Sequence, residues 1–597
     1  MLEARFGDAA SFLATWLAWR NDADRCEYLE FIAVEPRPPA RAALTAGDHR
    51  DPRLAPLADQ LQRAWPPLTP DLHAMHFEGG RVRLLLAVGE LPHWLTRLET
   101  RIDCLALGAA DFASEPHDAH LAKRLARLSA PGATLTLPRG DPLLPGRLAS
   151  AGFEVDENPE TCARAAFVHA RFVPRFAPRP APRSAAAGGP ARRAIRPTPA
   201  TAAPHAVIVG AGLAGCAAAW ALAECGWRST VIDRAGRIAS QASGNGAGLF
   251  HGTLNEPDGL HARFNRAASV AAHAAVRAAV EGHRVRGATD GMLRLERTLD
   301  VAAMRAMLQR LRLPPDYLQA LDAAQASAVA GLALCHPAWF FAGGGWVHPA
   351  GLARAYLERA GAAATLRLGV EVHAVRREGE GWRLLDAVGG TLAESEMVVL
   401  ANAADAQRLV GEAEWPLESM RGQISQLPAA DAPFALPRVP IAGAGYLLPP
   451  IDAMAVFGAT AQAGDADARV RIADHHANLA QLERLIGRRV EVDAASLQGR
   501  TAWRCTSADR LPLIGAVPDA ALARVSERID QPRFVPRLPG LFVFTALGSR
   551  GITWSALGAQ VLAAGMTGAT PPIETALLDA VDPARFISRR ARRAGGR

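Results

Sequence analysis

A strand, a glycine-rich turn and a helix follow one another from residue 205 to residue 225, and this order constrains the fold more than any other feature of the chain. The strand 206–209 is apolar throughout, as expected for a strand buried on both faces of a parallel sheet. Glycines then occupy the first, third and sixth places of a GxGxxG pattern, at Gly210, Gly212 and Gly215. They permit a tight turn, close approach of a pyrophosphate to the backbone, and close packing of helix on sheet. The pattern therefore predicts an α/β domain that binds a dinucleotide.

The residues after this helix extend the predicted dinucleotide site. A second strand ends at Asp233, whose carboxylate is expected to accept hydrogen bonds from ribose hydroxyls. The helix 213–225 presents the positive end of its dipole to the phosphates. The segment Ala242-Ser-Gly-Asn-Gly-Ala-Gly248 follows, and its polar side chains Ser243 and Asn245 are candidates for the same site.

A second strand-to-helix turn gated by glycine lies far downstream. The strand 541–545 leads through Ala546-Leu-Gly-Ser-Arg-Gly551 into a helix expected from 554 to 565. Such a turn presents further backbone N–H groups, and the expected ligand is a flavin. Gly548 and Gly551 therefore join the predicted cofactor-binding residues.

Composition places the chain among soluble globular proteins of two or more domains, since its 597 residues are 49% hydrophobic and 21% charged. It has no apolar run of 18 residues and no signal-peptide pattern at the N-terminus, so we expect a cytoplasmic protein that does not span a membrane. Its seven cysteines are odd in number and form no CxxC pair. This pattern argues against a disulfide framework or a zinc site, and no metal is predicted.

An arginine-, proline- and alanine-rich stretch at 171–204 divides the chain into predicted domains at 1–170 and 205–597. Seven arginines and no acidic residue lie between Arg171 and His205, which is typical of a stiff solvated linker. The net charge is +7, and a second interpretation is that these arginines contact a polyanion. The arginine run from Arg585 to Arg597 permits the same interpretation.

Between the two glycine turns, helical and strand patterns alternate without an internal repeat. The expected elements are helices at 262–281 and 301–311 and strands at 366–376, 381–386, 397–400, 446–449 and 455–460. The strand 397–400 runs into Ala401-Asn-Ala403, a common ending for one arm of an FAD site. This alternation favours an α/β fold for the larger domain.

The segment 206–597 resembles the D-amino-acid oxidase and glycine oxidase class of FAD enzymes. The stretches that carry this resemblance are the glycine pattern at 210–215, Ser243-Gly-Asn245, Gly344-Gly-Trp-Val-His-Pro349, Arg504-Cys-Thr-Ser-Ala-Asp509-Arg-Leu-Pro512-Leu-Ile-Gly515 and Gly548-Ser-Arg550-Gly551. The resemblance implies an FAD-binding Rossmann domain with an antiparallel-sheet substrate subdomain.

The whole chain is similar to the family of bifunctional tRNA 5-methylaminomethyl-2-thiouridine biosynthesis enzymes, in which an N-terminal methyltransferase is fused to such an oxidase. Close matches to its pattern are Arg421-Gly-Gln-Ile-Ser425, Gly445-Tyr-Leu-Leu-Pro449 and Ala546-Leu-Gly-Ser-Arg-Gly551. The resemblance implies tRNA as partner and FAD and S-adenosylmethionine as cofactors. It also implies two reactions: oxidative removal of the carboxymethyl group from a 5-carboxymethylaminomethyl-(2-thio)uridine at the wobble position, and methylation of the resulting amine.

Two other function classes stay open. The first is a small-molecule amine oxidase acting on glycine or sarcosine, with a vestigial N-terminal domain. The second is a tRNA-binding or scaffold protein that keeps FAD for structure.

Oxidising a carboxymethylamine requires a group that holds the substrate carboxylate, and the fork of an arginine matches its two oxygens. By the resemblance, Arg504 stands at the carboxylate-binding position and Arg550 at a second active-site arginine. Tyr446 is a candidate phenol for the same carboxylate. The alternative for each arginine is a structural ion pair. His251 and His348 lie in matched segments, but a lone histidine is more often structural, so neither is predicted to be catalytic.

The N-terminal part resembles the family's methyltransferase half, with strands expected at 29–34, 82–87, 102–107 and 133–137. The resemblance implies a Rossmann-like fold in which Gly7, Glu35 and Glu90 bind S-adenosylmethionine, Glu35 through the ribose and Glu90 near the adenine.

This half also departs from the family pattern. Where the family pattern has three glycines, this chain reads Arg5-Phe-Gly-Asp-Ala9 and keeps one. The segments 108–113 and 157–165 also lack the residues that the family pattern has there. Because the sequence begins at this loop, we expect a truncated fold whose first, central strand is mostly missing, with unpaired strand edges. Methyl transfer is therefore expected to be weak or absent.

Overall fold

The computed structural model describes residues 1–44, 51–108, 120–138, 143–156, 167–174, 203–411 and 415–595. The chain forms two compact units. Among these residues, the first unit contains those up to Pro174 and the segment Gly568–Leu578, and the second contains those from Ala203 to Thr567 and from Asp579 onward. The predicted linker lies almost wholly outside the described residues.

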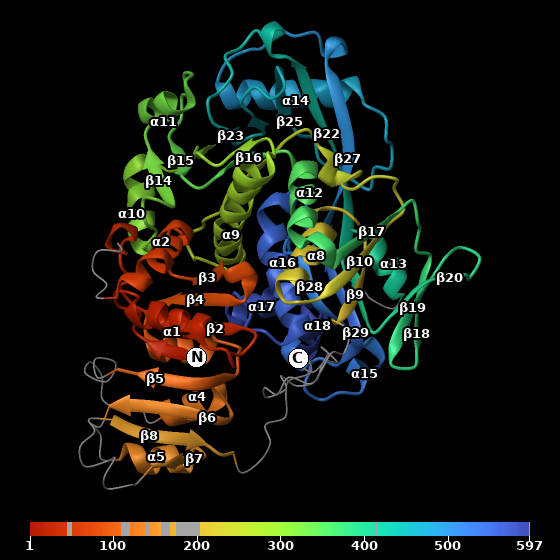
Figure 1. Ribbon diagram of the computed structural model, residues 1–597. Coiled ribbons are helices and arrows are strands. Elements are labelled where there is room, and N and C mark those ends of the chain that lie inside the picture. Colours follow the sequence, from red (N-terminus) through yellow and green to blue (C-terminus); the bar gives the residue numbers. More distant parts are fainter. Residues whose placement is uncertain are drawn as a thin grey trace. The chain divides into compact units, whose positions relative to one another are not determined.

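The N-terminal unit is built on an eight-stranded sheet with strand order β3-β4-β2-β1-β5-β6-β8-β7 (Figure 1). Its strands are β1 (Leu2–Ala4), β2 (Leu29–Glu35), β3 (Leu72–Phe77), β4 (Val82–Val88), β5 (Ile102–Leu107), β6 (Ser129–Pro138), β7 (Phe153–Val155) and β8 (Phe167–Phe172). Strands β4, β2, β1, β5 and β6 are parallel neighbours, and β3 and β8 run antiparallel to theirs. The four strands predicted from the sequence are confirmed as β2, β4, β5 and β6.

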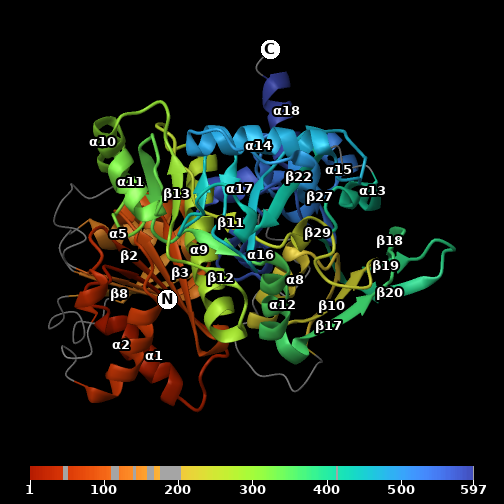
Figure 2. The same cartoon turned by 90° about the horizontal axis from the view of Figure 1, so that it is seen from above.

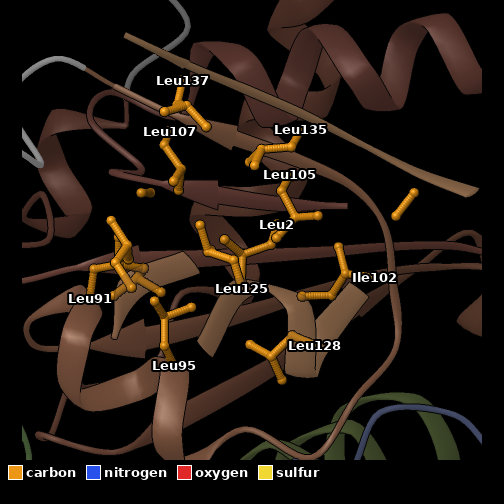
Figure 3. Packing of buried hydrophobic residues seen from close by; sticks show 14 of the residues in the cluster. Leu2, Leu91, Leu95, Ile102, Leu105, Leu107, Leu125, Leu128, Leu135 and Leu137 are labelled. Atoms are coloured by element: carbon orange, nitrogen blue, oxygen red, sulfur yellow. The ribbon is translucent and has the colours of Figure 1, made fainter. Parts of the chain in front are cut away.

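Helices cover both faces of this sheet. They are α1 (Ala10–Asn21), α2 (Ala55–Ala64), α3 (Leu91–Arg97), α4 (Leu121–Leu128) and α5 (Leu144–Ser150). One buried cluster joins α1 and α2 to the sheet. The other joins α3, α4 and α5 to the opposite face, and Figure 3 shows its leucines, among them Leu2, Leu105 and Leu125.

The expectation of a missing first strand is wrong. Strand β1 lies between β2 and β5 at the centre of the sheet, where Leu2 pairs with Ile32 on one side and Leu105 on the other. Three residues suffice because the strand pairs with a neighbour on each side, and Leu2 is fully buried. The expectation of unpaired edges is therefore wrong for Ile32–Val34 of β2 and Leu105–Leu107 of β5, which β1 pairs.

The second unit contains a six-stranded Rossmann sheet of order β17-β10-β9-β21-β29-β28. The strands are β9 (His205–Val209), β10 (Arg228–Asp233), β17 (Ala364–Leu368), β21 (Met397–Leu400), β28 (Leu513–Pro518) and β29 (Arg537–Thr545). Only β28 is antiparallel to its neighbour. The helices packed together beside it are α8 (Leu213–Glu224), α9 (Leu260–His283), α12 (Pro349–Ala360) and α16 (Gly551–Thr567) (Figures 1 and 2).

The predicted strand at 366–376 is wrong, because it is two strands in different sheets. Gly369 has φ +71° and ends β17. The chain then enters β18 (Ala374–Glu378), which forms a separate antiparallel sheet with β19 (Gly381–Leu385) and β20 (Thr391–Ser395).

The second unit also contains a largely antiparallel nine-stranded sheet, with order β14-β15-β13-β23-β24-β25-β22-β26 and β27 paired to β22. Its strands are β13 (Met292–Leu295), β14 (Leu318–Leu321), β15 (Ala338–Phe341), β22 (Leu417–Pro428), β23 (Ile441–Ala442), β24 (Tyr446–Leu447), β25 (Met454–Gly458), β26 (Gln462–Ala463) and β27 (Gln498–Ser507). Helix α14 (Ile472–Ile486) shares a buried cluster with one face of this sheet. The predicted α/β class, with an antiparallel substrate subdomain, is confirmed.

The segment Gly568–Leu578 is part of the N-terminal unit although it follows α16 in sequence. Thr570 donates to Glu30 at 3.0 Å, and the buried Glu574 forms an ion pair with Arg97 at 2.8 Å. The sequence placed this segment in a domain from 205 to 597, since no local pattern signals a return of the chain to another unit.

Replacing Glu574 by glutamine is expected to lower the free energy of unfolding of the N-terminal unit by about 1–3 kcal/mol, because it removes the charge that pairs with Arg97 at a buried position. The measurement is thermal unfolding followed by tryptophan fluorescence. Asp51→Asn is the matched control, since its pair with Arg53 is exposed and is expected to contribute little. Equal melting temperatures for the two variants would contradict the assigned role of Glu574.

Candidate active site

The first glycine turn is shaped by close backbone contacts. Gly210 has φ +109°, and a Cβ there would lie 2.6 Å from the carbonyl oxygen of Ala401. A Cβ on Gly215 would lie 1.8 Å from the carbonyl oxygen of Gly210. Only glycine fits at these two positions, because real side chains do not approach backbone so closely. Gly212 is less restricted, since its nearest neighbour is the Ser243 hydroxyl at 3.3 Å.

Asp233 lies at the end of β10 and fixes this turn. Its Oδ2 accepts from the backbone N–H of Ala211 at 2.7 Å, and its Oδ1 accepts from Ala235 at 2.8 Å. Each carboxylate oxygen can accept a further hydrogen bond, so the acid remains able to bind ribose hydroxyls.

The polar segment after β10 closes over the start of α8. Ser243 Oγ accepts from the backbone N–H of Leu213 at 3.1 Å. Asn245 Oδ1 accepts from Arg500 of β27, and Arg500 also donates to the carbonyl oxygen of Gln241 at 2.6 Å. Sequence reasoning missed Arg500, because nothing local marks an arginine that holds a loop 255 residues away.

The second glycine turn reaches the same cavity as the first. Gly548 has φ +53° and donates to the carbonyl oxygen of Cys505 at 2.8 Å, and Gly551 begins α16. The cavity has a volume of about 1020 Å³. Its lining includes seven predicted cofactor-binding residues: Gly210, Gly212, Asp233, Ser243, Asn245, Gly548 and Gly551. Gly215 packs beneath the lining.

These residues fit a dinucleotide. Two helix N-termini, those of α8 and α16, meet one cavity, and both favour negative charge. The side chain of Asn402 also lines it, and its buried Oδ1 has no hydrogen-bond partner among the described residues. The segment Ala401-Asn-Ala403, which follows the strand 397–400, was the sequence signal for a cofactor site at this position.

Arg504, Arg550 and Tyr446 line the same cavity. Arg504 Nη2 donates to the carbonyl oxygen of Thr460 at 3.2 Å, and within the described parts of the chain neither arginine pairs with a carboxylate. Burial lowers the pKa of Arg504, and burial together with the charge of Arg294 lowers the pKa of Arg550 to about 10. Arg550 therefore stays cationic at neutral pH, and both guanidiniums face the cavity with no carboxylate partner among the described residues.

Tyr446 is half-buried near Arg504. Burial raises the pKa of its phenol to about 12, although the nearby charge of Arg504 acts in the opposite direction. The phenol is therefore protonated at neutral pH and can donate a hydrogen bond.

The two histidines not predicted to be catalytic hold structural contacts. Burial and the charge of Arg550 lower the pKa of His251 to about 3, so its ring is neutral, and it packs 5.2 Å from the ring of Phe341. His348 is the N-cap of α12, where Nδ1 accepts from Gly351 N–H at 3.0 Å.

In the N-terminal unit, Gly7 follows β1, Glu35 ends β2 and Glu90 follows β4, so all three lie at the carboxyl edge of the sheet. Glu35 Oε2 accepts from the backbone N–H of Gly7 at 3.2 Å and Oε1 accepts from Arg37 at 3.0 Å, the same arrangement that Asp233 makes in the other unit. Glu90 is exposed at the start of α3. The carboxylate of Glu35 thus fits a ribose, because ligands of α/β sheets bind at the carboxyl ends of the strands.

The loop around Gly7 fits S-adenosylmethionine less well. Gly7 has φ +56°, and the residues two before and two after it, Arg5 and Ala9, also have positive φ, at +85° and +70°. The backbone keeps a glycine-like conformation although two of its positions bear side chains, which is strained for L-residues.

The interpretation of the C-terminal arginine run as a polyanion contact is wrong for Arg585. This side chain is buried and donates to Asp509 Oδ2 at 2.8 Å, and Arg589 pairs with the same carboxylate. The arginines of the linker lie outside the described residues, apart from Arg171.

Neither a membrane-spanning helix nor a metal-binding group of histidine, cysteine and carboxylate side chains occurs in the described ranges.

L-proline dehydrogenase from P. horikoshii shares the fold of the second unit. It superposes with a TM-score of 0.50 at 15% identity, covering 65% of this chain and 98% of that one. Glycine oxidase from Geobacillus kaustophilus gives a TM-score of 0.48 at 23% identity, covering 63% of this chain and 97% of that one.

Residues 205–564 match the family model described as FAD dependent oxidoreductase. The chain is also similar to proteins named tRNA 5-methylaminomethyl-2-thiouridine biosynthesis bifunctional protein MnmC. The one from Methylibium petroleiphilum is 43% identical over 599 residues, covering 98% of this chain and 90% of the relative. One from Burkholderia mallei is 38% identical over 609 residues, covering 99% of this chain and 90% of the relative. The chain therefore belongs to the family of these bifunctional tRNA-modifying proteins, and its residues 205–564 to the FAD-dependent oxidoreductases, as the sequence predicted.

Proposed function

We propose that this protein is a cytoplasmic enzyme that removes the carboxymethyl group from 5-carboxymethylaminomethyl-(2-thio)uridine at the wobble position of tRNA and leaves a 5-aminomethyl group. The observation that supports this proposal is that Arg504 and Arg550, which have no carboxylate partner in the described ranges, face the cavity of the second unit together with Tyr446. An anionic substrate would supply the charge that these residues lack.

Arg504 is the proposed carboxylate ligand. Its fork offers two parallel N–H donors to the two carboxylate oxygens, and the protonated phenol of Tyr446 adds a third. Gripping the carboxylate orients the adjacent CH₂ carbon toward the cofactor cavity. FAD, when bound there, supplies the acceptor for the two electrons of the reaction. Oxidation of the C–N bond gives an imine of the substrate, and water then releases the amine and glyoxylate.

The proposed cofactor ligands are the two glycine turns and Asp233. The backbone N–H groups at the starts of α8 and α16 would bind the phosphates and the flavin, and Asp233 the ribose. Arg500 is a positioning residue, since it orders the segment that bears Ser243 and Asn245.

Anaerobic mixing distinguishes this proposal from a glycine or sarcosine oxidase. The visible flavin absorbance should bleach with tRNA that contains the carboxymethylaminomethyl uridine, and much more slowly with free glycine or sarcosine. Equal or faster bleaching by glycine would favour the small-molecule oxidase, and no bleaching by any carboxymethylamine would favour a scaffold that keeps FAD for structure.

The family's second reaction is methylation of the amine with S-adenosylmethionine, and we propose that it is weakened in this chain. The observation that favours this is the strained loop, where Arg5 and Ala9 occupy positive-φ positions beside the ribose-binding acid Glu35. Micromolar binding of S-adenosylmethionine to the purified protein would contradict the proposal.

Ala9→Gly tests the loop directly. Glycine adopts φ +70° without the Cβ clash, so we expect the variant to stabilise the N-terminal unit by about 1 kcal/mol and to tighten S-adenosylmethionine binding. Calorimetric titration and the melting temperature measure the two effects. Ala10→Gly, one residue later within α1, is the control, and it is expected to destabilise the unit because its backbone is helical.

A further inference from the structure

A third arginine, Arg294, shares the sheet face that presents Tyr446 to the cavity. In the register of the large sheet, Arg294 of β13 pairs with Ala442 of β23, and Ala442 pairs with Tyr446 of β24. Residues paired across strands point to the same face of a sheet. Ala442 and Tyr446 both line the cavity, and Arg294 lies one strand further along the same face.

Arg294 and Arg550 act on each other electrostatically from two different elements. The charge of Arg294 lowers the pKa of both Arg550 and His251, so the three groups lie within electrostatic reach of one another. His251 is neutral, and it supplies no negative charge between the two guanidiniums.

Arg294 has no acidic partner in the described part of the chain. Glu296 is the nearest acid on its own strand face, but its carboxylate is already used. Its Oε2 accepts from Trp339 Nε1 at 2.9 Å, and its Oε1 accepts from the Thr298 hydroxyl at 2.6 Å. Both arginines are half-buried, and two guanidiniums within electrostatic reach of each other repel, so an anion between them removes that cost.

We propose that Arg294 and Arg550 form a second anion position, separate from the carboxylate position of Arg504 and Tyr446, which binds a phosphate group of the tRNA beside the modified uridine. The inference rests on the proposed function. Glycine and sarcosine have one anionic group, whereas a carboxymethylaminomethyl nucleotide has two, a carboxylate and a phosphate. The second position would therefore select a nucleotide over a free amino acid.

The test compares 5-carboxymethylaminomethyluridine with its 3′- and 5′-monophosphates as ligands of the holoenzyme, with dissociation constants taken from the shift of the flavin spectrum. We expect at least one of the monophosphates to bind about 10-fold or more tightly than the nucleoside, because charge-assisted hydrogen bonds to phosphate are strong. In Arg294→Gln this difference should disappear while the affinity for the nucleoside stays unchanged.

Two further variants keep the result interpretable. Arg297→Gln removes an exposed arginine just beyond the same strand and should keep the preference for the monophosphate. Arg294→Lys retains the charge without the fork and should keep part of it. FAD content shows whether each variant is folded.

Equal binding of the nucleoside and both monophosphates to the wild-type enzyme would overturn the inference. Iminodiacetate, a small amine with two carboxylates, gives a second check. If Arg294→Gln loses more affinity for iminodiacetate than for either monophosphate, the inference is also overturned, since the second position would then bind a carboxylate of a small diacid. Failure of the proposed function looks different, because the flavin would then not be bleached by the modified tRNA even though the anion position binds nucleotides.

Discussion

Replacing Arg504 by alanine is expected to lower kcat/KM for the carboxymethylamine substrate by about two to three orders of magnitude, while the flavin remains bound. The substrate carboxylate would lose both hydrogen bonds of the guanidinium fork, and removing one partner of a buried charge pair costs about 2–5 kcal/mol. The measurement is steady-state or single-turnover oxidation, with FAD content determined in parallel. Arg504→Lys keeps the charge but not the fork, so its kcat/KM should lie between those of the wild type and Arg504→Ala.

Gly422 offers an independent test of the role of Arg504. A Cβ on Gly422 would lie very close to Arg504 Nη2, at 2.2 Å, so Gly422→Ala is expected to displace the guanidinium without removing it. The alanine variant should reproduce much of the Arg504→Ala defect with normal FAD content. Full activity in both variants would show that another group binds the carboxylate.

Gly215→Ala is expected to abolish FAD binding and to destabilise the second unit. The added Cβ would lie 1.8 Å from the carbonyl oxygen of Gly210, and neither backbone can move away without separating α8 from β9. The purified variant should therefore be colourless and melt at lower temperature. Spectroscopic FAD content and differential scanning fluorimetry measure the two effects.

Gly565→Ala is the matched control for this substitution. Gly565 lies inside α16, and a Cβ added there would meet no atom within 4 Å. Alanine should therefore stabilise the helix by up to about 1 kcal/mol and leave FAD binding intact. A yellow, stable Gly215→Ala variant would contradict the role assigned to the first glycine turn.

Much of the second unit was predictable because its signals are local. The apolar strand before Gly210, the glycine spacing and the acid at the end of the next strand each depend on neighbours within about thirty residues. The helix expected at 301–311 was confirmed with the same bounds as α10 (Val301–Leu311), since Asp300 caps it and its apolar positions recur at helical spacing.

The split of the expected strand 366–376 at Gly369 has a local cause, whereas the other differences come from pairing between distant parts of the chain. Strand β1 exists because β2 and β5 supply partners on both sides, although three residues alone have no strand signal. Arg585 looks like an exposed basic residue in sequence, but its ion pair with Asp509 is made in the interior. Arg500 and Arg294 gained their assigned positions through strand register, which no local pattern encodes.

The sequence by itself determined the dinucleotide turn at Gly210–Gly215 and the α/β class, because both rest on residue types at short, mechanically required spacing. The family and the candidate carboxylate ligand Arg504 came from the resemblance of longer stretches to known enzymes. Only the tertiary structure decided that both glycine turns open into one cavity, that Arg294 shares a sheet face with Tyr446, and that Gly568–Leu578 belongs to the N-terminal unit. Those facts depend on long-range packing and strand register, in which the free energy of a contact comes from residues far apart in the sequence.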